Sequence, residues 1–222
     1  MKRFISALLV SLCIGSPALA VDPEIKEWKT PHAMGCMLLR ECRDGVQEIY
    51  SSSDIDEFFQ SASAKEIQAE FDELTLLLSM AGVGVFVGDA KYFPHGQRGV
   101  YHVTSNNFYL NREHMGRPGT LITLVRHEGW HAVQDCMGGT ISNSILAIVH
   151  NEEDVPGVWQ TIGVSTYEKG PLPWEKEAIW AGHTKGKTIK GLEACLRGNM
   201  WEAYPPTPLT RKYLVENGYI KD

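Results

Sequence analysis

Residues 124–136, LVRHEGWHAVQDC, place two histidines four positions apart with a glutamate directly after the first. Thr120 can cap the start of a helix over this stretch, and Gly138 and Gly139 can end it. Positions i and i+4 lie on the same face of a helix, so His127 and His131 are expected side by side. The apolar positions around them recur at helical spacing: Leu121, Leu124, Val125, Ala132 and Val133.

Two imidazoles on one helical face can bind a single ion, and zinc accepts nitrogen ligands at ~2.0–2.1 Å. Glu128 is rotated by about 100° from His127 around the helix, which leaves it beside the ion rather than bound to it. A carboxylate in that place can take the proton of a metal-activated water as the water attacks a carbonyl group. The pattern predicts His127 and His131 as zinc ligands and Glu128 as the general base. The alternative is an ordinary pair of histidines on a surface or core helix.

A catalytic zinc site needs a third protein ligand and keeps one coordination position open. Asp135 lies a full turn past His131 and would point beyond the ion, so a ligand from a second helix is favoured. The segment WEKEAIWAG, after Pro173, predicts such a helix, although the glycines at 182, 186 and 191 interrupt its continuation. The downstream candidates are Asp135, His150, Glu152, Glu153, Asp154, Glu175, Glu177 and His183.

The motif His127-Glu128-x-x-His131, followed 46 residues later by Glu177, resembles the gluzincin group of zinc metallopeptidases and its small minigluzincin members. The resemblance covers about residues 100–181. It implies an α+β, zincin-like fold, in which a small mixed or antiparallel sheet packs on an active-site helix and on a second, glutamate-bearing helix.

The resemblance also implies Glu177 as the third zinc ligand. In the family this glutamate is often followed by alanines, as Glu177 is followed by Ala178 and Ala181, and small residues let two helices approach each other. Glu175 is the alternative, and because it is turned by about 200° from Glu177 the two cannot serve together. Many members have an aspartate that supports a zinc histidine where this chain has Ala181. Another group must therefore orient the imidazoles.

Gluzincins use a tyrosine or a histidine to stabilise the oxyanion formed during peptide hydrolysis. Tyr167, ten residues before Glu177, and His183 match such groups by position. The alternatives are a packed tyrosine and a solvated histidine. The resemblance further implies that the strand before the motif helix, NNFYLN, is a sheet edge that receives an extended peptide. The alternative for this segment is an ordinary structural strand.

Several other elements are predicted by local patterns. The segment 36–51, CMLLRECRDGVQEIYS, predicts a hairpin around the turn at 43–45. Ser63 and Glu66 predict a capping box for a helix that ends at Gly82. VGVFVGD and RGVYHVTSNNFYLN predict three strands, two of them paired as a hairpin. Residues 156–173 are expected to form a long loop, and 208–217 a short helix.

The first twenty residues, MKRFISALLVSLCIGSPALA, have the pattern of a signal peptide, with two positive charges, an apolar run and a small-x-small end. The apolar run is shorter than the ~20 residues that a membrane-spanning helix requires. We therefore expect a signal peptide at 1–20 and a single zincin-like domain at 21–222, with its core at about 60–200. The protein is expected to be secreted or periplasmic.

Export affects the interpretation of the cysteines, because disulfides persist outside the cytoplasm. Cys36, Cys42, Cys136 and Cys195 allow three pairings. If 36–42 is a strand, its two cysteines lie ~20 Å apart and need distant partners, whereas in a loop they can join each other. A zinc-thiolate cluster is the other alternative, but the sequence has no Cys-x-x-Cys pair.

The 27 acidic residues outnumber the 21 basic ones, and no basic cluster stands out, which argues against nucleic acid and anionic membrane as partners. The leading hypothesis is an exported zinc metallopeptidase that acts on peptide or protein substrates. One alternative is a disulfide-stabilised exported binding or envelope-associated protein with a non-catalytic zinc site. Another is a zinc enzyme that acts on a different amide or ester. No pattern indicates an oligomeric state.

Overall fold

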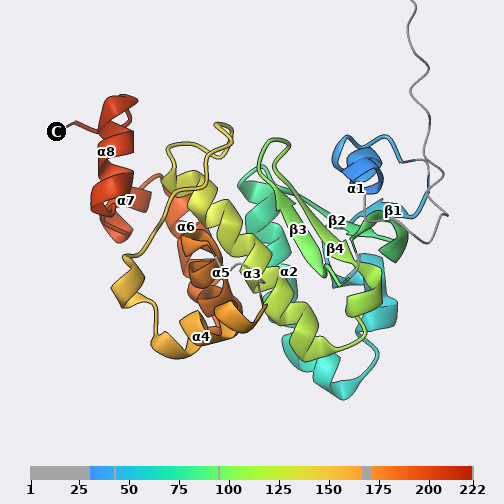
Figure 1. Ribbon diagram of the computed structural model, residues 1–222. Helices are drawn as coiled ribbons and strands as arrows, with labels where there is room; N and C mark the ends of the chain where they lie inside the picture. The colour runs from blue at the N-terminus through green and yellow to red at the C-terminus, as the bar shows by residue number, and fades with distance from the viewer. Residues whose placement is uncertain (1–30, 43, 95, 167–171, 222) are drawn as a thin grey trace, which may run out of the picture.

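The computed structural model describes residues 31–42, 44–94, 96–166 and 172–221, and these form an α+β fold with a mixed four-stranded sheet (Figure 1). The strand order is β1-β2-β4-β3, with β2 parallel to β4 and the other two pairs antiparallel. The strands are β1 (Val46–Glu48), β2 (Gly84–Gly88), β3 (Gly99–His102) and β4 (Asn107–Asn111). The predicted signal peptide at 1–20 lies outside the described residues.

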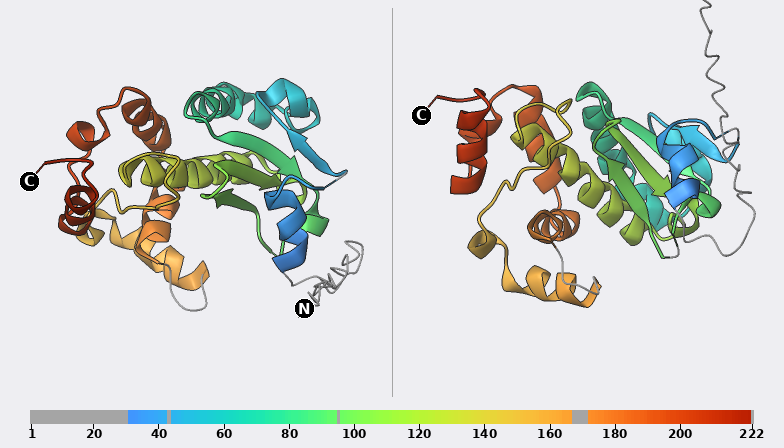
Figure 2. Two further views of the ribbon diagram at one scale, coloured as in Figure 1. Left: turned by 90° about the horizontal axis from the view of Figure 1, so that it is seen from above. Right: turned by 45° about the horizontal axis from the view of Figure 1, so that its top comes forward.

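Alternate side chains of the two central strands, β2 and β4, pack into two separate cores, because successive residues of a strand point to opposite faces of the sheet. On one face they meet α2 (Ala62–Met80) and α3 (Pro118–Met137) in the larger core, through Val85, Val87, Phe108 and Leu110. On the other face Phe86 and Tyr109 stack on each other and pack with Met37 of α1 (Pro31–Leu38). Figure 2 shows α1 and α2 on opposite sides of the sheet.

Helix α3 is surrounded by α2, α5 (Pro173–His183) and α6 (Lys187–Leu196). Small residues make this close packing feasible. A Cβ added at Gly182 would lie 3.0 Å from the backbone oxygen of Thr123, and one at Gly191 would lie 2.8 Å from both methyls of Val133. Gly186, with φ of 75°, ends the continuity between α5 and α6. The doubt raised by the glycines is thus confirmed, because two helices stand where one was considered.

The remaining helices lie around this centre. The predicted C-terminal helix is confirmed as α8, and Thr207 caps it by accepting a hydrogen bond from the backbone of Thr210. Residues 156–173, expected to be a loop, include α4, so that expectation was wrong in part. These helices are α4 (Gly157–Thr166), α7 (Met200–Ala203) and α8 (Pro208–Glu216), with short 3₁₀ turns at η1 (Ser52–Phe58), η2 (Ala90–Tyr92), η3 (Arg112–His114) and η4 (Glu152–Asp154).

The hairpin predicted over 36–51 was wrong. Residues up to Leu38 belong to α1, and a disulfide between Cys36 and Cys42 closes the turn that follows it. The strand β1 pairs with β2 instead. Two helix starts also differ from the sequence patterns. Ser61, rather than Ser63, caps α2, and α3 begins with Pro118, two residues before the expected cap.

The second disulfide joins Cys136, at the end of α3, to Cys195 in α6. Of the alternatives left open by the sequence, the local Cys36–Cys42 bridge is the one that the structure contains. Two disulfides indicate an oxidising, non-cytoplasmic environment. Within the described ranges, no helix combines the length and the apolar character needed to cross a membrane.

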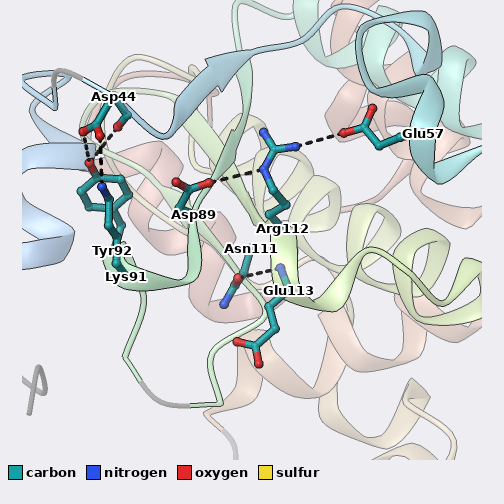
Figure 3. A network of polar contacts seen from close by, with 8 residues as sticks. All are labelled: Asp44, Glu57, Asp89, Lys91, Tyr92, Asn111, Arg112 and Glu113. Atoms are coloured by element: carbon teal, nitrogen blue, oxygen red, sulfur yellow. Dashed lines mark hydrogen bonds and ion pairs between the residues drawn. The ribbon is translucent and has the colours of Figure 1, made fainter. Parts of the chain in front are cut away.

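A polar network fixes the connection that leads from β4 into α3 (Figure 3). Arg112 follows β4 directly and forms ion pairs with Glu57 at 3.1 Å and with Asp89 at 3.4 Å. Asn111 caps the same turn, since its side chain accepts a hydrogen bond from the backbone of Glu113 at 3.1 Å. These contacts tie the start of the motif helix to η1 and to the end of β2.

Candidate metal centre

Helices α3 and α5 bring His127, His131 and Glu175 together in a group that could hold a metal ion. The potential ligand atoms of the three residues lie within 4.8 Å of one another. The Nε2 atoms of His127 and His131 lie 3.3 Å and 3.6 Å from the two carboxylate oxygens of Glu175. The two imidazole rings are nearly perpendicular, with centroids 5.1 Å apart. The sequence prediction that His127 and His131 face a common point is consistent with this geometry.

The third member of this group is Glu175, the alternative considered in the sequence, whereas the resemblance implied Glu177 as the third ligand. Glu177 is 1% exposed, and its carboxylate is turned into the interior. It accepts hydrogen bonds from the side chains of Trp130 and Gln134 and from the backbone of Val149 and His150. Because four donors already surround it, Glu177 is a structural carboxylate behind the metal group.

Glu128 lies next to the group and is 7% exposed. Burial raises the pKa of Glu128 to about 7, the nearby charge of Glu175 adds to the rise, and the charge of His127 and a hydrogen bond from the backbone of Tyr101 oppose it. A carboxyl group with a pKa near neutrality can both accept and donate a proton, as a general base must. Tyr101 belongs to β3, so Glu128 links the motif helix to a sheet edge.

The two histidines differ in their electrostatic surroundings. Burial lowers the pKa of His131 to about 4, and the charge of His127 contributes, so this imidazole is neutral at physiological pH. Burial also acts to lower the pKa of His127, but a hydrogen bond with Glu175 and the charges of Glu128 and Glu175 raise it overall. Neutral imidazole is the form that binds metals.

Both imidazoles also have partners other than Glu175. Nδ1 of His131 lies 2.7 Å from Oε1 of Gln134, one turn further along α3. His127 has a hydrogen bond with the backbone of Ala178, on α5. The presence of Ala181 in place of the family's aspartate had implied that other groups must orient the imidazoles, and these two contacts meet that need. Gln134 could have been identified from the sequence as such a partner, because it lies three positions after His131 and positions i and i+3 are neighbours on a helix.

Of the two residues expected to stabilise the oxyanion, His183 lies within the described residues and Tyr167 does not. His183 is exposed at the end of α5, and its ring stacks on Trp159 of α4 at 4.6 Å. Burial lowers the pKa of His183, and the charges of His127 and Arg126 add to this effect. His183 therefore borders the metal group without belonging to it.

The predicted edge strand is different from the observed one. The segment NNFYLN forms β4, which lies between β2 and β3, whereas β3 is at the edge of the sheet. The hydroxyl of Tyr101 in β3 donates a hydrogen bond to the buried Asp135 at 2.8 Å, which fastens the edge strand to α3. Asp135 was one of the candidate metal ligands, and this contact shows that its carboxylate binds Tyr101 instead of joining the metal group.

Two other candidates, His150 and Glu152, have contacts outside the metal group. His150 stacks on Trp130 with centroids 5.8 Å apart, and its Nε2 is 2.8 Å from the ammonium group of Lys187. Glu152 forms an ion pair with Lys176. Comparison with models of known protein families, with curated proteins and with solved structures finds no match to this chain.

Proposed function

We propose that this chain is an exported zinc-dependent metallopeptidase, with His127, His131 and Glu175 as the zinc ligands and Glu128 as the general base. The observation that carries the proposal is the convergence of two imidazoles and one carboxylate from two helices, with a second, buried carboxylate beside them. The HExxH spacing and this convergence are independent observations, because one is local in sequence and the other depends on the packing of α5 against α3.

The donor set fits zinc. Two histidine nitrogens and one carboxylate oxygen form one of the ligand sets found at catalytic zinc sites, where a fourth position stays open. The side chains of His127 and Glu175 are 17% and 19% exposed, while that of His131 is 7% exposed. The group is therefore reachable from solvent on the side of His127 and Glu175. A bound zinc ion would supply Lewis acidity that polarises a peptide carbonyl and makes a water molecule more acidic.

The surroundings of Glu128 support peptide hydrolysis. Its raised pKa suits the removal of a proton from water and the delivery of that proton to the leaving amine. The edge strand β3 contacts Glu128 through the backbone of Tyr101, so an extended peptide added to this edge would run past the general base. We assign β3, in place of β4, as the strand that would hold the substrate.

The test is a Glu128→Gln variant, compared with the parent protein and with Glu66→Gln, an exposed glutamate on α2. We expect the parent to contain one zinc ion per chain and to cleave an unfolded protein substrate. The Glu128→Gln variant should retain zinc and lose cleavage by at least ~10²-fold, the lower range for general base catalysis. Full cleavage by this variant would reject the mechanism. Bound zinc without cleavage by the parent would favour the non-catalytic zinc site instead.

A further inference from the structure

The two ring nitrogens of His131 face two different groups, and both groups are connected to α5. Nε2 lies 3.6 Å from Glu175, which is on α5 itself. Nδ1 lies 2.7 Å from the side-chain oxygen of Gln134, which is on α3. The amide nitrogen of Gln134 in turn donates to two acceptors of α5. Both ring nitrogens of His131 therefore face groups linked to α5, Nε2 directly and Nδ1 through Gln134.

The orientation of the Gln134 amide is determined by its neighbours. Its nitrogen donates to the backbone oxygen of Trp174 at 2.8 Å and to Oε2 of Glu177 at 2.8 Å. A backbone carbonyl and a carboxylate only accept hydrogen bonds. A flipped amide would place its oxygen against two other oxygens, so the nitrogen must face α5 and the oxygen must face His131.

This orientation selects one tautomer of His131. The amide oxygen of Gln134 is an acceptor, so Nδ1 of His131 must carry the proton in the hydrogen bond between them. In a neutral imidazole the other nitrogen, Nε2, then presents its lone pair. Nε2 is the atom that faces Glu175. The tautomer imposed by Gln134 is therefore the one that can bind a metal at this point.

Glu177 keeps the amide of Gln134 in place. The side chain of Glu177 is buried between α3, α5 and the segment before η4, and it accepts from the backbone of Val149 at 3.2 Å and of His150 at 2.6 Å. Trp130 donates a further hydrogen bond at 3.3 Å. With these donors fixed by backbone and ring geometry, the carboxylate cannot rotate away from Gln134 without losing several of them.

We infer that Gln134 and Glu177 are positioning residues that hold His131 in its metal-binding tautomer. This inference rests on the proposed metal site but not on peptide hydrolysis. It gives the two glutamates of α5 separate roles: Glu175 faces the ion, and Glu177 acts on His131 through Gln134. Groups behind a metal ligand of this kind typically change metal affinity 10–100-fold when they are removed.

The first experiment measures the tautomer directly, in the metal-free protein, by ¹⁵N NMR of labelled histidines. The signals of His131 are assigned by their loss in a His131→Gln variant. We expect the parent protein to show a protonated Nδ1 and an unprotonated Nε2. Gln134→Met keeps the length of the side chain and removes the hydrogen bond, so His131 should become a mixture of both tautomers. A parent protein with its proton on Nε2 of His131 would overturn the inference.

The second experiment measures zinc affinity by competition with a chelator. Gln134→Met should bind zinc 10–100-fold more weakly than the parent. Glu177→Gln keeps an acceptor for the Gln134 amide, so its affinity should fall by less. The matched control is Thr188→Val, which removes a different hydrogen bond from a buried side chain to α3, the one to the backbone oxygen of Arg126. Equal affinities for Gln134→Met and Thr188→Val would also overturn the inference.

The outcomes separate this inference from the proposed function. A protein that binds zinc and shows the expected tautomer, but cleaves no peptide, would contradict the peptidase and leave the positioning role intact. A protein whose cleavage depends on Glu128, but whose His131 tautomer and zinc affinity do not respond to Gln134→Met, would contradict the positioning role alone. Thermal unfolding of each variant establishes that a loss of affinity does not arise from a loss of fold.

Discussion

The raised pKa of Glu128 predicts a stability effect that can be measured without any substrate. Burial raises this pKa from its ordinary value of 4.5 to about 7, and the side chain is only 7% exposed. Each pKa unit corresponds to 1.36 kcal/mol, so keeping Glu128 ionised in the folded, metal-free protein costs roughly 3 kcal/mol. Replacing Glu128 with glutamine removes this cost and should stabilise the metal-free protein at pH 8.

The sign of the pH dependence follows from linkage. Because the folded pKa is above the unfolded one, the folded state binds more protons between pH 4.5 and about 7, and the wild type loses stability as the pH rises through this window. The advantage of Glu128→Gln should therefore grow across the window and level off above it. Contributions of groups that titrate in both proteins largely cancel in the difference.

The assay is urea unfolding of both proteins in the presence of a chelator, at several pH values from 4.5 to 8.5, with the free energy of unfolding extrapolated to water. Glu66→Gln, at an exposed site on α2, is the matched control. A difference between Glu128→Gln and the wild type that is constant with pH would refute the reasoning. It would mean that Glu128 titrates at the same pH in the folded and unfolded states.

Three further predictions concern the centre and its frame. Glu175→Ala removes the carboxylate that faces both imidazoles, so zinc measured by competition should bind at least ~100-fold more weakly, beyond the effect of any positioning residue. Replacing Cys136 and Cys195 with serine opens a loop closed over a sequence separation of 59, and the free energy of unfolding measured in urea should fall by about 4 kcal/mol. Glu70 and Arg126 form an ion pair between α2 and α3 through two hydrogen bonds, and their side chains are 9% and 12% exposed. Glu70→Gln leaves Arg126 without this charged partner. The same assay should show a loss of about 3 kcal/mol.

The motif helix was predictable from the sequence because its signals are local. The apolar spacing and Gly138 give its course and its end. Only its cap differs, because it lies at Arg117, three residues before Thr120. The three strands were predictable for the same reason, and so was the pairing of β3 with β4, which are close in the chain. The position of β2 was not predictable, because its parallel pairing with β4 depends on packing between segments far apart in sequence.

The error at residues 36–51 has a different origin. The alternation of apolar residues around the turn at 43–45 satisfied the pattern of a hairpin, but Met37 instead packs with Phe86 and Tyr109 on the outer face of the sheet. The disulfide between Cys36 and Cys42 holds their Cα atoms 5.0 Å apart, which a continuous strand would not permit. A covalent constraint and a tertiary contact thus determined this segment, and neither is encoded in the local pattern.

The choice between Glu175 and Glu177 depended on the rotation of α5 about its axis. The small residues after Glu177, Ala178 and Ala181, are both fully buried, and they mark the face of α5 that enters the interior. Glu177 shares that face, so it is buried and fully engaged with donors. Glu175, turned by about 200°, lies at the margin of the interface and is 19% exposed.

A ligand at the margin suits a site that must stay open, because a coordination position facing solvent can be reached only from the rim of a helix interface. The small residues that favoured Glu177 in the sequence lie on the buried face of α5, and this burial suits Glu177 to the supporting role. The two glutamates, spaced two apart on one helix, lie on opposite sides of His131: Glu175 faces Nε2, and Glu177 is linked to Nδ1 through Gln134. An exchange of their roles would require α5 to turn by about half a revolution. Such a turn would replace Gly182 at its close approach to α3, where an added Cβ would lie 3.0 Å from the backbone oxygen of Thr123, with a larger side chain.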